Sequence, residues 1–330
     1  MRLHWTAILA VNFMCTGLFA QHKYAVKKSF PVYGMGKWDY LTLGPDDHLY
    51  VSNFSQVNVL DKNTGDSLGV IKGTAGVHGV AFVPKTGKGY TSNGAANTVS
   101  VFDLKTFKVL NTIKAGENPD AIFYEPWSKK LITSNGKSQD LSLIDPVTEK
   151  VVATIALAGK PETAVSNQKG MLYVNLEDKN EILAIDLHTN TVKARWSLAP
   201  AEAPTGLVYD AKTNRLYAGC EESFIALDAS TGKVVSRLPI GASCDGVAFN
   251  PKTREIFTSN GEGTMNVIKA GGPDSYQVLD KVPTQLNGKT ITIDPKTGHL
   301  YISVATYGPA VEKGVRPPVI ANSFKVMDIY

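Results

Sequence analysis

The chain has few cysteines: three among 330 residues. Cys15 falls in the apolar N-terminal segment, so Cys220 and Cys244 are the two in the rest of the chain. So small a number excludes a fold held together by a disulfide framework. Three alternatives remain for this pair: one disulfide in an oxidising compartment, a pair of soft metal ligands, or plain buried thiols.

An excess of charge of one sign is also missing. The chain has 34 Lys and Arg residues against 30 Asp and Glu, a formal net charge of +4, and the basic residues are scattered. A nucleic-acid groove requires a concentrated basic surface, so nucleic acid is not indicated as a partner.

Motifs that would identify an enzyme or a haem protein are scarce. The sequence contains neither a C-x-x-C-H haem attachment site nor an H-E-x-x-H zinc motif. Gly136-Lys137-Ser138 and Gly288-Lys289-Thr290 resemble the end of a phosphate loop, but each lacks the glycine five residues earlier. No cofactor follows from these patterns.

The N-terminal residues have the pattern of an export signal. Arg2 is followed by an apolar stretch from about Trp5 to Phe19, and Ala20 is a suitable cleavage point. This stretch is too short to span a membrane, and no later stretch approaches the required length. We therefore expect residues 1–20 to be a signal peptide and the mature chain, without a transmembrane segment, to be periplasmic or secreted.

One strand-like segment recurs seven times. The copies centre on Tyr50, Tyr90, Ile132, Tyr173, Tyr217, Phe257 and Tyr301, at intervals of 40 to 44 residues. Self-similarity at this period with β-rich units is typical of a β-propeller with one blade per repeat. The sequence therefore predicts an all-β fold in which residues 21–330 form a single domain of seven four-stranded blades.

The last repeat has no outer strand of its own, because the chain ends at Tyr330. We expect residues 24–30, at the mature N-terminus, to supply that strand. Such a composite blade pairs the two chain ends and removes an exposed sheet edge.

The first strand of each blade lines the axis of a propeller, so the residues that start these strands meet at one end. Counting back six residues from the proline of the first turn, or using the repeat register where proline is missing, selects one residue per blade. These are Asp39, His78, Asp120, Glu162, Thr205, Asp245 and Lys289. We call this set the axial ring, and we predict that it contacts a ligand.

The second strand of each blade runs antiparallel to the first, so its end lies at the same face. Asparagines stand there in several repeats and are further ligand-binding candidates: Asn93, Asn135, Asn175 and Asn260. A long connection over residues 306–322, which carries Arg316, opens at this face as well. Long loops in compact folds often contact ligands.

Three functional interpretations of the axial ring are open. Its carboxylates (Asp39, Asp120, Glu162 and Asp245) could hold a divalent cation through oxygen ligands. The ring could instead bind a cationic or polyhydroxylated small molecule. Alternatively, two carboxylates with His78 as the base could catalyse hydrolysis or elimination, since packed like charges separate pKa values. The structural alternative is that these groups only cap strands and link blades.

Several of the repeated segments resemble a known family. Leu49-Tyr50-Val51-Ser52-Asn53, Gly89-Tyr90-Thr91-Ser92-Asn93 and the segment from Asn97 to Asp103 are similar to the bacterial YVTN propeller repeat. Residues 24–330 resemble the exported YncE-like proteins built from that repeat. The resemblance implies seven blades and a location in the cell envelope, and it supplies no catalytic motif.

Taken with the ring, these observations favour an exported scaffold that binds a small ligand or an envelope protein at the polar end of the axis. The competing hypothesis is a metal-assisted enzyme of the lactonase or lyase type, with the carboxylates as ligands and His78 as the base. Fold alone does not decide between them.

Overall fold

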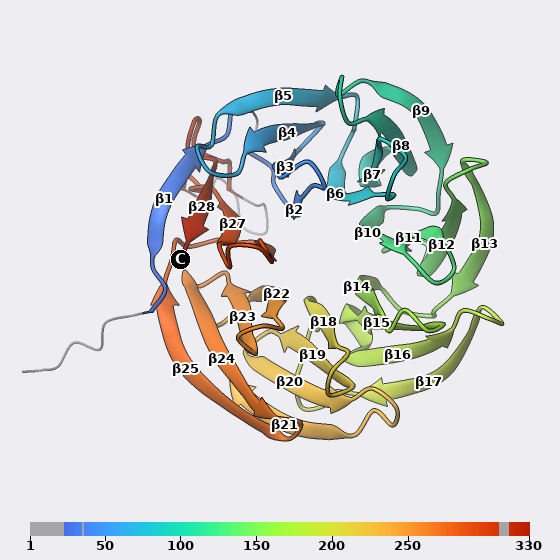
Figure 1. The fold of residues 1–330 in the computed structure, drawn as a ribbon, viewed down its shortest axis with the longest axis vertical. Coiled ribbons are helices and arrows are strands. Elements are labelled where there is room, and N and C mark those ends of the chain that lie inside the picture. The colour runs from blue at the N-terminus through green and yellow to red at the C-terminus, as the bar shows by residue number, and fades with distance from the viewer. Residues whose placement is uncertain (1–22, 35, 310–316) are drawn as a thin grey trace, which may run out of the picture.

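The computed structural model describes residues 23–34, 36–309 and 317–330. Within them the chain forms seven antiparallel sheets of four strands each, arranged around a common axis (Figure 1). The predicted seven-bladed propeller is therefore confirmed. The expected signal peptide and Arg316 lie outside the described residues.

Strands follow one another from the axis outward in the first six blades. Blade one contains β2 (Leu41–Leu43), β3 (His48–Asn53), β4 (Gln56–Asp61) and β5 (Ser67–Lys72), and blade two contains β6 (Val77–Phe82), β7 (Lys88–Asn93), β8 (Thr98–Asp103) and β9 (Val109–Lys114). Blade three contains β10 (Pro119–Glu125), β11 (Lys130–Asn135), β12 (Asp140–Asp145) and β13 (Lys150–Ala156), and blade four contains β14 (Pro161–Ser166), β15 (Met171–Leu176), β16 (Glu181–Asp186) and β17 (Thr191–Ser197).

The remaining blades follow the same plan. Blade five contains β18 (Leu207–Asp210), β19 (Arg215–Cys220), β20 (Ser223–Asp228) and β21 (Val234–Pro239), and blade six contains β22 (Cys244–Asn250), β23 (Glu255–Asn260), β24 (Thr264–Gly272) and β25 (Ser275–Pro283). Blade seven contains β26 (Ile291–Ile293), β27 (Leu300–Val304), β28 (Lys325–Ile329) and, outermost, β1 (Val26–Pro31). The described residues include two one-turn 3-10 segments, η1 (Gly94–Ala96) and η2 (Glu177–Lys179), and no helix long and apolar enough to cross a membrane.

The core lies between neighbouring blades, because each sheet has another sheet against both faces. The two middle strands of a blade are accordingly buried on both sides, as in β3 and β4. One apolar cluster joins Ile132 and Leu141 of blade three to Leu172 and Val174 of blade four. Outer strands alternate instead, as in β17, where exposed and partly buried residues take turns.

The composite last blade is confirmed. β1 pairs antiparallel with β28, from Val26 opposite Ile329 to Pro31 opposite Lys325. In Figure 1 the blue N-terminal strand closes the red C-terminal sheet. The N-terminal segment also contacts blade six, because the Tyr24 hydroxyl donates a hydrogen bond to Glu255 Oε2 at 2.7 Å.

Candidate functional site

The axial ring is assembled at one end of the propeller axis, as the repeat register predicted. Its members stand at or just before the starts of the innermost strands, and neighbouring members from different blades contact each other. Asp39 contacts His78, His78 approaches Asp120, and Lys289 contacts Asp245. Residues up to 250 positions apart in sequence thus share one small volume.

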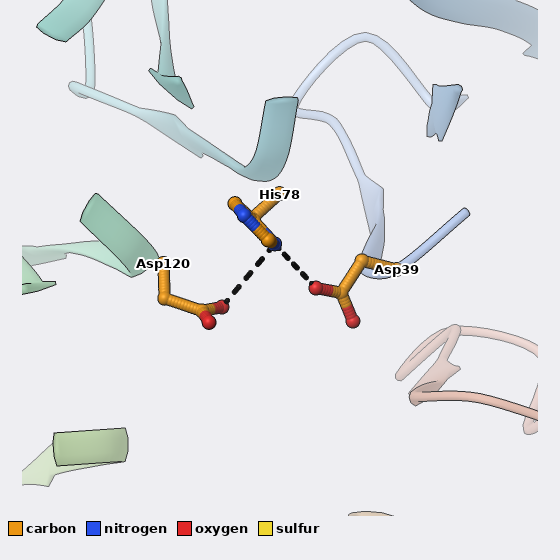
Figure 2. A group of neighbouring side chains, drawn as sticks. All are labelled: Asp39, His78 and Asp120. Atoms are coloured by element: carbon orange, nitrogen blue, oxygen red, sulfur yellow. Dashed lines mark hydrogen bonds and ion pairs between the residues drawn. The ribbon is translucent and has the colours of Figure 1, made fainter. Parts of the chain in front are cut away.

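The closest group joins blades one, two and three. His78 Nδ1 lies 2.6 Å from Asp39 Oδ2 and 3.7 Å from Asp120 Oδ1. Figure 2 shows the imidazole of His78 between the two carboxylates. Asp120 is 8% exposed, and its Oδ1 is buried without a hydrogen-bond partner among the described residues.

The other carboxylates of the ring have lysine partners. Glu162 forms an ion pair of 2.9 Å with Lys160, which also contacts Glu177. Asp245 forms one of 3.1 Å with Lys289, while the second oxygen of Asp245, Oδ2, is buried and has no hydrogen-bond partner among the described residues. Two buried acceptors of the ring thus have no donor in the part of the chain that the structure describes.

Thr205 links two neighbouring blades. Its hydroxyl donates a hydrogen bond of 2.7 Å to the backbone oxygen of Cys244, in the next blade. The predicted structural alternative therefore applies to this member of the ring.

Small residues follow most members of the ring, because the innermost strands approach each other closely. A Cβ atom on Gly206 would lie 2.5 Å from the backbone nitrogen of Val247, and one on Gly246 would lie 2.8 Å from that of Ile291. No side chain fits at such contacts.

Tyr40 and Lys160 belong to the site, although the repeat register does not select them. Burial raises the pKa of Tyr40, and the charges of four ring carboxylates (Asp120, Glu162, Asp39 and Asp245) add to the effect. In the sequence, Tyr40 differs from its counterparts by its size, because the other blades have Gly, Ala or Thr at this position. Lys160 gave no comparable signal, because no repeat rule selects the residue two before Glu162.

Burial raises the pKa values of three acids in the ring, and the neighbouring cations oppose this effect. Burial raises the pKa of Asp120, and the charge of Asp39 adds to this against the opposing charges of His78 and Lys160. Burial and the charge of Asp120 likewise raise the pKa of Glu162. Burial also raises the pKa of Asp245, against the opposing charge of Lys289. Perturbed carboxylates in one place are characteristic of functional sites.

His78 is a cation at neutral pH. Burial lowers its pKa, but the hydrogen bond to Asp39 and the charges of Asp120 and Asp39 outweigh burial and raise the pKa from 6.5 to about 9. The imidazole therefore carries the positive charge that offsets its two carboxylate neighbours.

We expect the Asp39→Asn substitution to lower the pKa of His78 by about 1–3 pH units, because an adjacent carboxylate favours the charged imidazole. The interactions that raise the pKa of His78 stabilise the fold fully below pH 6.5, and this stabilisation is lost as the pH rises through about 9. The free energy of unfolding should therefore fall between these pH values, and fall less in the variant. NMR titration of the His78 ring measures the pKa, and urea unfolding measures the stability.

Asp186→Asn is the matched control for Asp39→Asn, because it removes the carboxylate paired with the exposed His188, outside the ring. This control should leave the pKa of His78 unchanged. An unchanged His78 titration in the variant would contradict the assigned ion pair.

Cavities lie at both ends of the axis. At the polar end, a cavity of about 230 Å³ is lined by Ser243, Asp245, Gly261, Asn287, Gly288, Lys289 and Tyr307. At the opposite end, one of about 630 Å³ is lined largely by apolar groups such as Val208, Phe249 and Ile293. A third, of about 650 Å³, lies between blades six and seven beside Leu286 and Met327 and contacts no member of the ring. The polar-end cavity is the smallest of the three and the one that contains ring residues.

The asparagine candidates are almost completely buried. The register places Asn93, Asn135 and Asn260 opposite the starts of the inner strands, at the expected face. However, these three and Asn175 are at most 1% exposed. Their amide groups donate hydrogen bonds within the propeller, for example from Asn93 Nδ2 to Ser100 Oγ at 2.8 Å. These hydrogen bonds hold the strands together, and contact of the four asparagines with a ligand stays a prediction.

Cys220 and Cys244 are free thiols in the structure, and both are buried. The disulfide that the sequence left open is therefore not formed here. Burial raises the pKa of Cys220 to about 12 and that of Cys244 well above its usual value, so both stay protonated. Thiols of this kind are inert and poor metal ligands.

One further sequence pattern has no catalytic context. Gly65-Asp66-Ser67-Leu68-Gly69 fits the G-x-S-x-G motif of a nucleophile elbow, which requires a turn from a strand into a helix. Here the segment runs from the β4–β5 hairpin into β5, the outer strand of blade one, and Ser67 is exposed. It forms no elbow.

Comparison with known proteins supports the fold. Residues 30–170 match the family model described as YNCE-like beta-propeller, so the predicted resemblance to this family is confirmed. A solved structure titled "Kuenenia stuttgartiensis Hydrazine Synthase" is similar with a TM-score of 0.73 and 18% identity, over 82% of this chain and 93% of that chain. At this identity the likeness shows the shared fold alone. The curated proteins include no match.

Proposed function

We propose that this chain, a YNCE-like beta-propeller by its match over residues 30–170 and its seven blades, is an exported scaffold that binds a small polar ligand at the axial ring. One observation carries the proposal. Asp120 Oδ1 and Asp245 Oδ2 are buried acceptors without a hydrogen-bond partner among the described residues. A buried acceptor left without a donor costs about 1–3 kcal/mol, so a ligand that supplies donors would be stabilised there.

The charges of the site define the ligand further. The four ring carboxylates and Glu177 face three cations, His78, Lys160 and Lys289, so the fully ionised site has two net negative charges. His78 and Lys160 are each engaged by two carboxylates. A molecule with ammonium, guanidinium or several hydroxyl groups therefore matches the site better than an anion does. The cavity of about 230 Å³ beside Asp245 limits this ligand to a small molecule.

Export is part of the same proposal. The pattern of residues 1–20 supports a signal peptide and hence a periplasmic or secreted protein. The alternative to a small molecule is an envelope protein. Such a partner would meet the same chemical requirements if it inserted a lysine or arginine side chain into the ring.

A lactonase or lyase is the second candidate, because the buried carboxyl groups of Asp120 and Glu162 have raised pKa values suited to general acids. The weak point is the base. His78 is protonated at neutral pH, with its Nδ1 held by Asp39. A binding role requires no proton transfer, and the geometry supports it better.

Isothermal titration of the mature protein against cationic and polyhydroxylated metabolites tests the proposal. Asp245→Asn and Asp120→Asn each remove an acceptor charge, and a hydrogen bond to a charged group contributes about 1.5–3 kcal/mol. We therefore expect each substitution to weaken binding by about tenfold or more. Asp66→Asn, at an exposed hairpin of blade one, is the control and should leave affinity unchanged. Binding heats that are the same in all three variants would remove the ring from the function.

A further inference from the structure

We propose that Asp39, His78 and Asp120 form a binding site for one divalent first-row transition-metal ion, such as Mn²⁺, Fe²⁺, Co²⁺ or Zn²⁺. This inference deepens the proposed function, on which it rests, because it names an inorganic ligand for the same end of the axis. It differs from the all-carboxylate set expected from the sequence, because His78 becomes a ligand, whereas Glu162 and Asp245 are held by lysines.

The geometry brings three donor atoms together. One atom from each residue, Asp39, His78 and Asp120, lies within 4.8 Å of the other two. Ligand atoms around a tetrahedral ion with bonds of 2.0–2.2 Å are separated by about 3.4 Å. His78 Nδ1 and Asp120 Oδ1 are 3.7 Å apart, close to that separation, and Asp39 Oδ2 is at 2.6 Å from the same nitrogen. A shift of under about 1 Å at Asp39 brings its oxygen to the separation that a tetrahedral ion requires. The ion then takes the place of the proton that Asp39 and His78 share.

The backbone holds these side chains in position. The hydroxyl of Ser52 accepts a hydrogen bond of 3.0 Å from the backbone nitrogen of Asp39. Ser92 accepts one of 2.9 Å from Gly79, beside His78, and donates another to the backbone oxygen of Asp120. The three ligands therefore project from strand starts that are fixed by the propeller itself, as a preformed site requires.

A second observation points to a ligand in this cluster. Asp120 is 8% exposed, its Oδ1 has no hydrogen-bond partner among the described residues, and this atom is directed towards His78 (Figure 2). His299 provides an instructive contrast. Its Nδ1 contacts Asp328 Oδ1 at 2.9 Å, but among the described residues this pair belongs to no group of three side chains that could hold a metal.

The donor set selects the class of ion. Imidazole nitrogen with carboxylate oxygen suits Zn²⁺, Fe²⁺ and related ions, whereas Ca²⁺ prefers six to eight oxygen ligands. Two carboxylates and a neutral imidazole carry two negative charges, which offset the charge of a divalent ion. Three protein ligands also leave at least one coordination position open. Asp245 and its cavity remain available to an organic ligand.

Titration of Co²⁺ into the metal-free mature protein tests the site, since bound Co²⁺ absorbs visible light according to its ligands. We expect one Co²⁺ per chain, a visible spectrum characteristic of nitrogen and oxygen ligands, and displacement by Zn²⁺. Asp120→Asn and His78→Gln should each weaken Co²⁺ binding at least about tenfold. His299→Gln, which removes the matched His–Asp pair, should leave it unchanged.

The wild-type spectrum and stoichiometry remain decisive even where His78→Gln fails to fold. Absence of stoichiometric Co²⁺ in the wild type, or full affinity in folded Asp120→Asn, would overturn the inference. Asp245→Asn separates the two proposals, because it should retain Co²⁺ and lose the organic ligand. An organic ligand that depends on Asp245, in a protein that binds no Co²⁺, overturns the metal site alone.

Discussion

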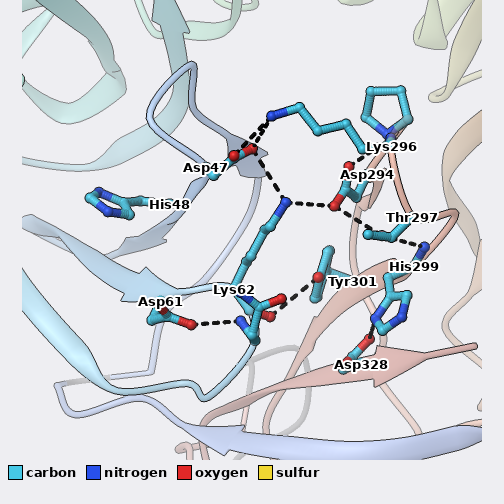
Figure 3. Close-up of polar contacts among 12 residues, drawn as sticks. Asp47, His48, Asp61, Lys62, Asp294, Lys296, Thr297, His299, Tyr301 and Asp328 are labelled. Carbon is cyan, nitrogen blue, oxygen red and sulfur yellow. Dashed lines mark hydrogen bonds and ion pairs between the residues drawn. The ribbon is translucent and has the colours of Figure 1, made fainter.

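Replacing Lys62 by methionine is expected to destabilise the folded propeller by about 3–5 kcal/mol, because it leaves a buried carboxylate without its partner. Lys62, from blade one, is 7% exposed, and its Nζ lies 2.7 Å from Asp294 Oδ2 in blade seven. Asp294 is fully buried. Figure 3 shows this pair together with Asp47 and Lys296, at the seam where the first and last blades meet.

Two features make this contact unusually sensitive. The ion pair joins residues 232 positions apart, so it forms only when the circle closes. In addition, Lys62 and the turn after β26 hold the pKa of Asp294 down at about 2 despite its burial, so the carboxylate stays charged at neutral pH. Removing one charge of such a pair leaves the other without compensation.

Urea unfolding followed by circular dichroism measures the loss. Lys281→Met is the matched control, since it removes a lysine paired with Glu262 at 2.7 Å whose side chain is 52% exposed. An exposed pair contributes at most about 1 kcal/mol. The double variant Lys62→Met/Asp294→Leu should recover much of the stability, because it removes both buried charges. Equal losses in Lys62→Met and Lys281→Met would contradict the assigned role.

Deleting residues 1–31 is expected to abolish cooperative folding. The deletion removes β1, the outer strand of blade seven, and with it Phe30, which is 4% exposed. Truncating such a phenylalanine to alanine alone costs about 3–5 kcal/mol. This is a large part of the 5–15 kcal/mol by which domains are typically stable. The deletion also exposes the edge of β28, which can then pair with other chains.

Size-exclusion chromatography with near-UV circular dichroism checks this expectation. A chain that begins at Lys23 is the control, since it keeps β1 and the contact between Tyr24 and Glu255. We expect this control to be folded, and the shorter chain to aggregate or to lose its near-UV signal. A folded, monodisperse chain without β1 would show that closure by the N-terminal strand is dispensable.

The fold could be predicted because the repeat itself encodes it. The recurrence of Tyr50, Tyr90 and their counterparts sets the number of blades, and the alternation along a strand then sets which residues start each inner strand. Asp39, His78 and Asp120 could therefore be placed together, although about 40 residues separate each from the next.

Side-chain direction could not be predicted in the same way. Asn135 stands at the expected face, yet its amide turns inward to Asp140 and Ser142, because a buried strand end needs its own donors satisfied. Lys160 contacts Glu162 of the axial ring, but the repeat register does not select its position. Some ring carboxylates pair with an imidazole and others with a lysine. These pairings depend on which residues stand nearby in other blades, and the spacing of the repeats does not reveal them.

Pairing of the chain ends has a consequence for how the molecule can be attached to something else. Ala25 and Tyr330 exchange backbone hydrogen bonds of 3.3 and 3.2 Å, at the end of β28. The third strand of a blade ends on the side away from the start of its first strand, so Ala25 and Tyr330 both lie on the side opposite His78 and its carboxylate neighbours. A solid support joined at Tyr330 would therefore lie on the side of the propeller opposite the axial ring.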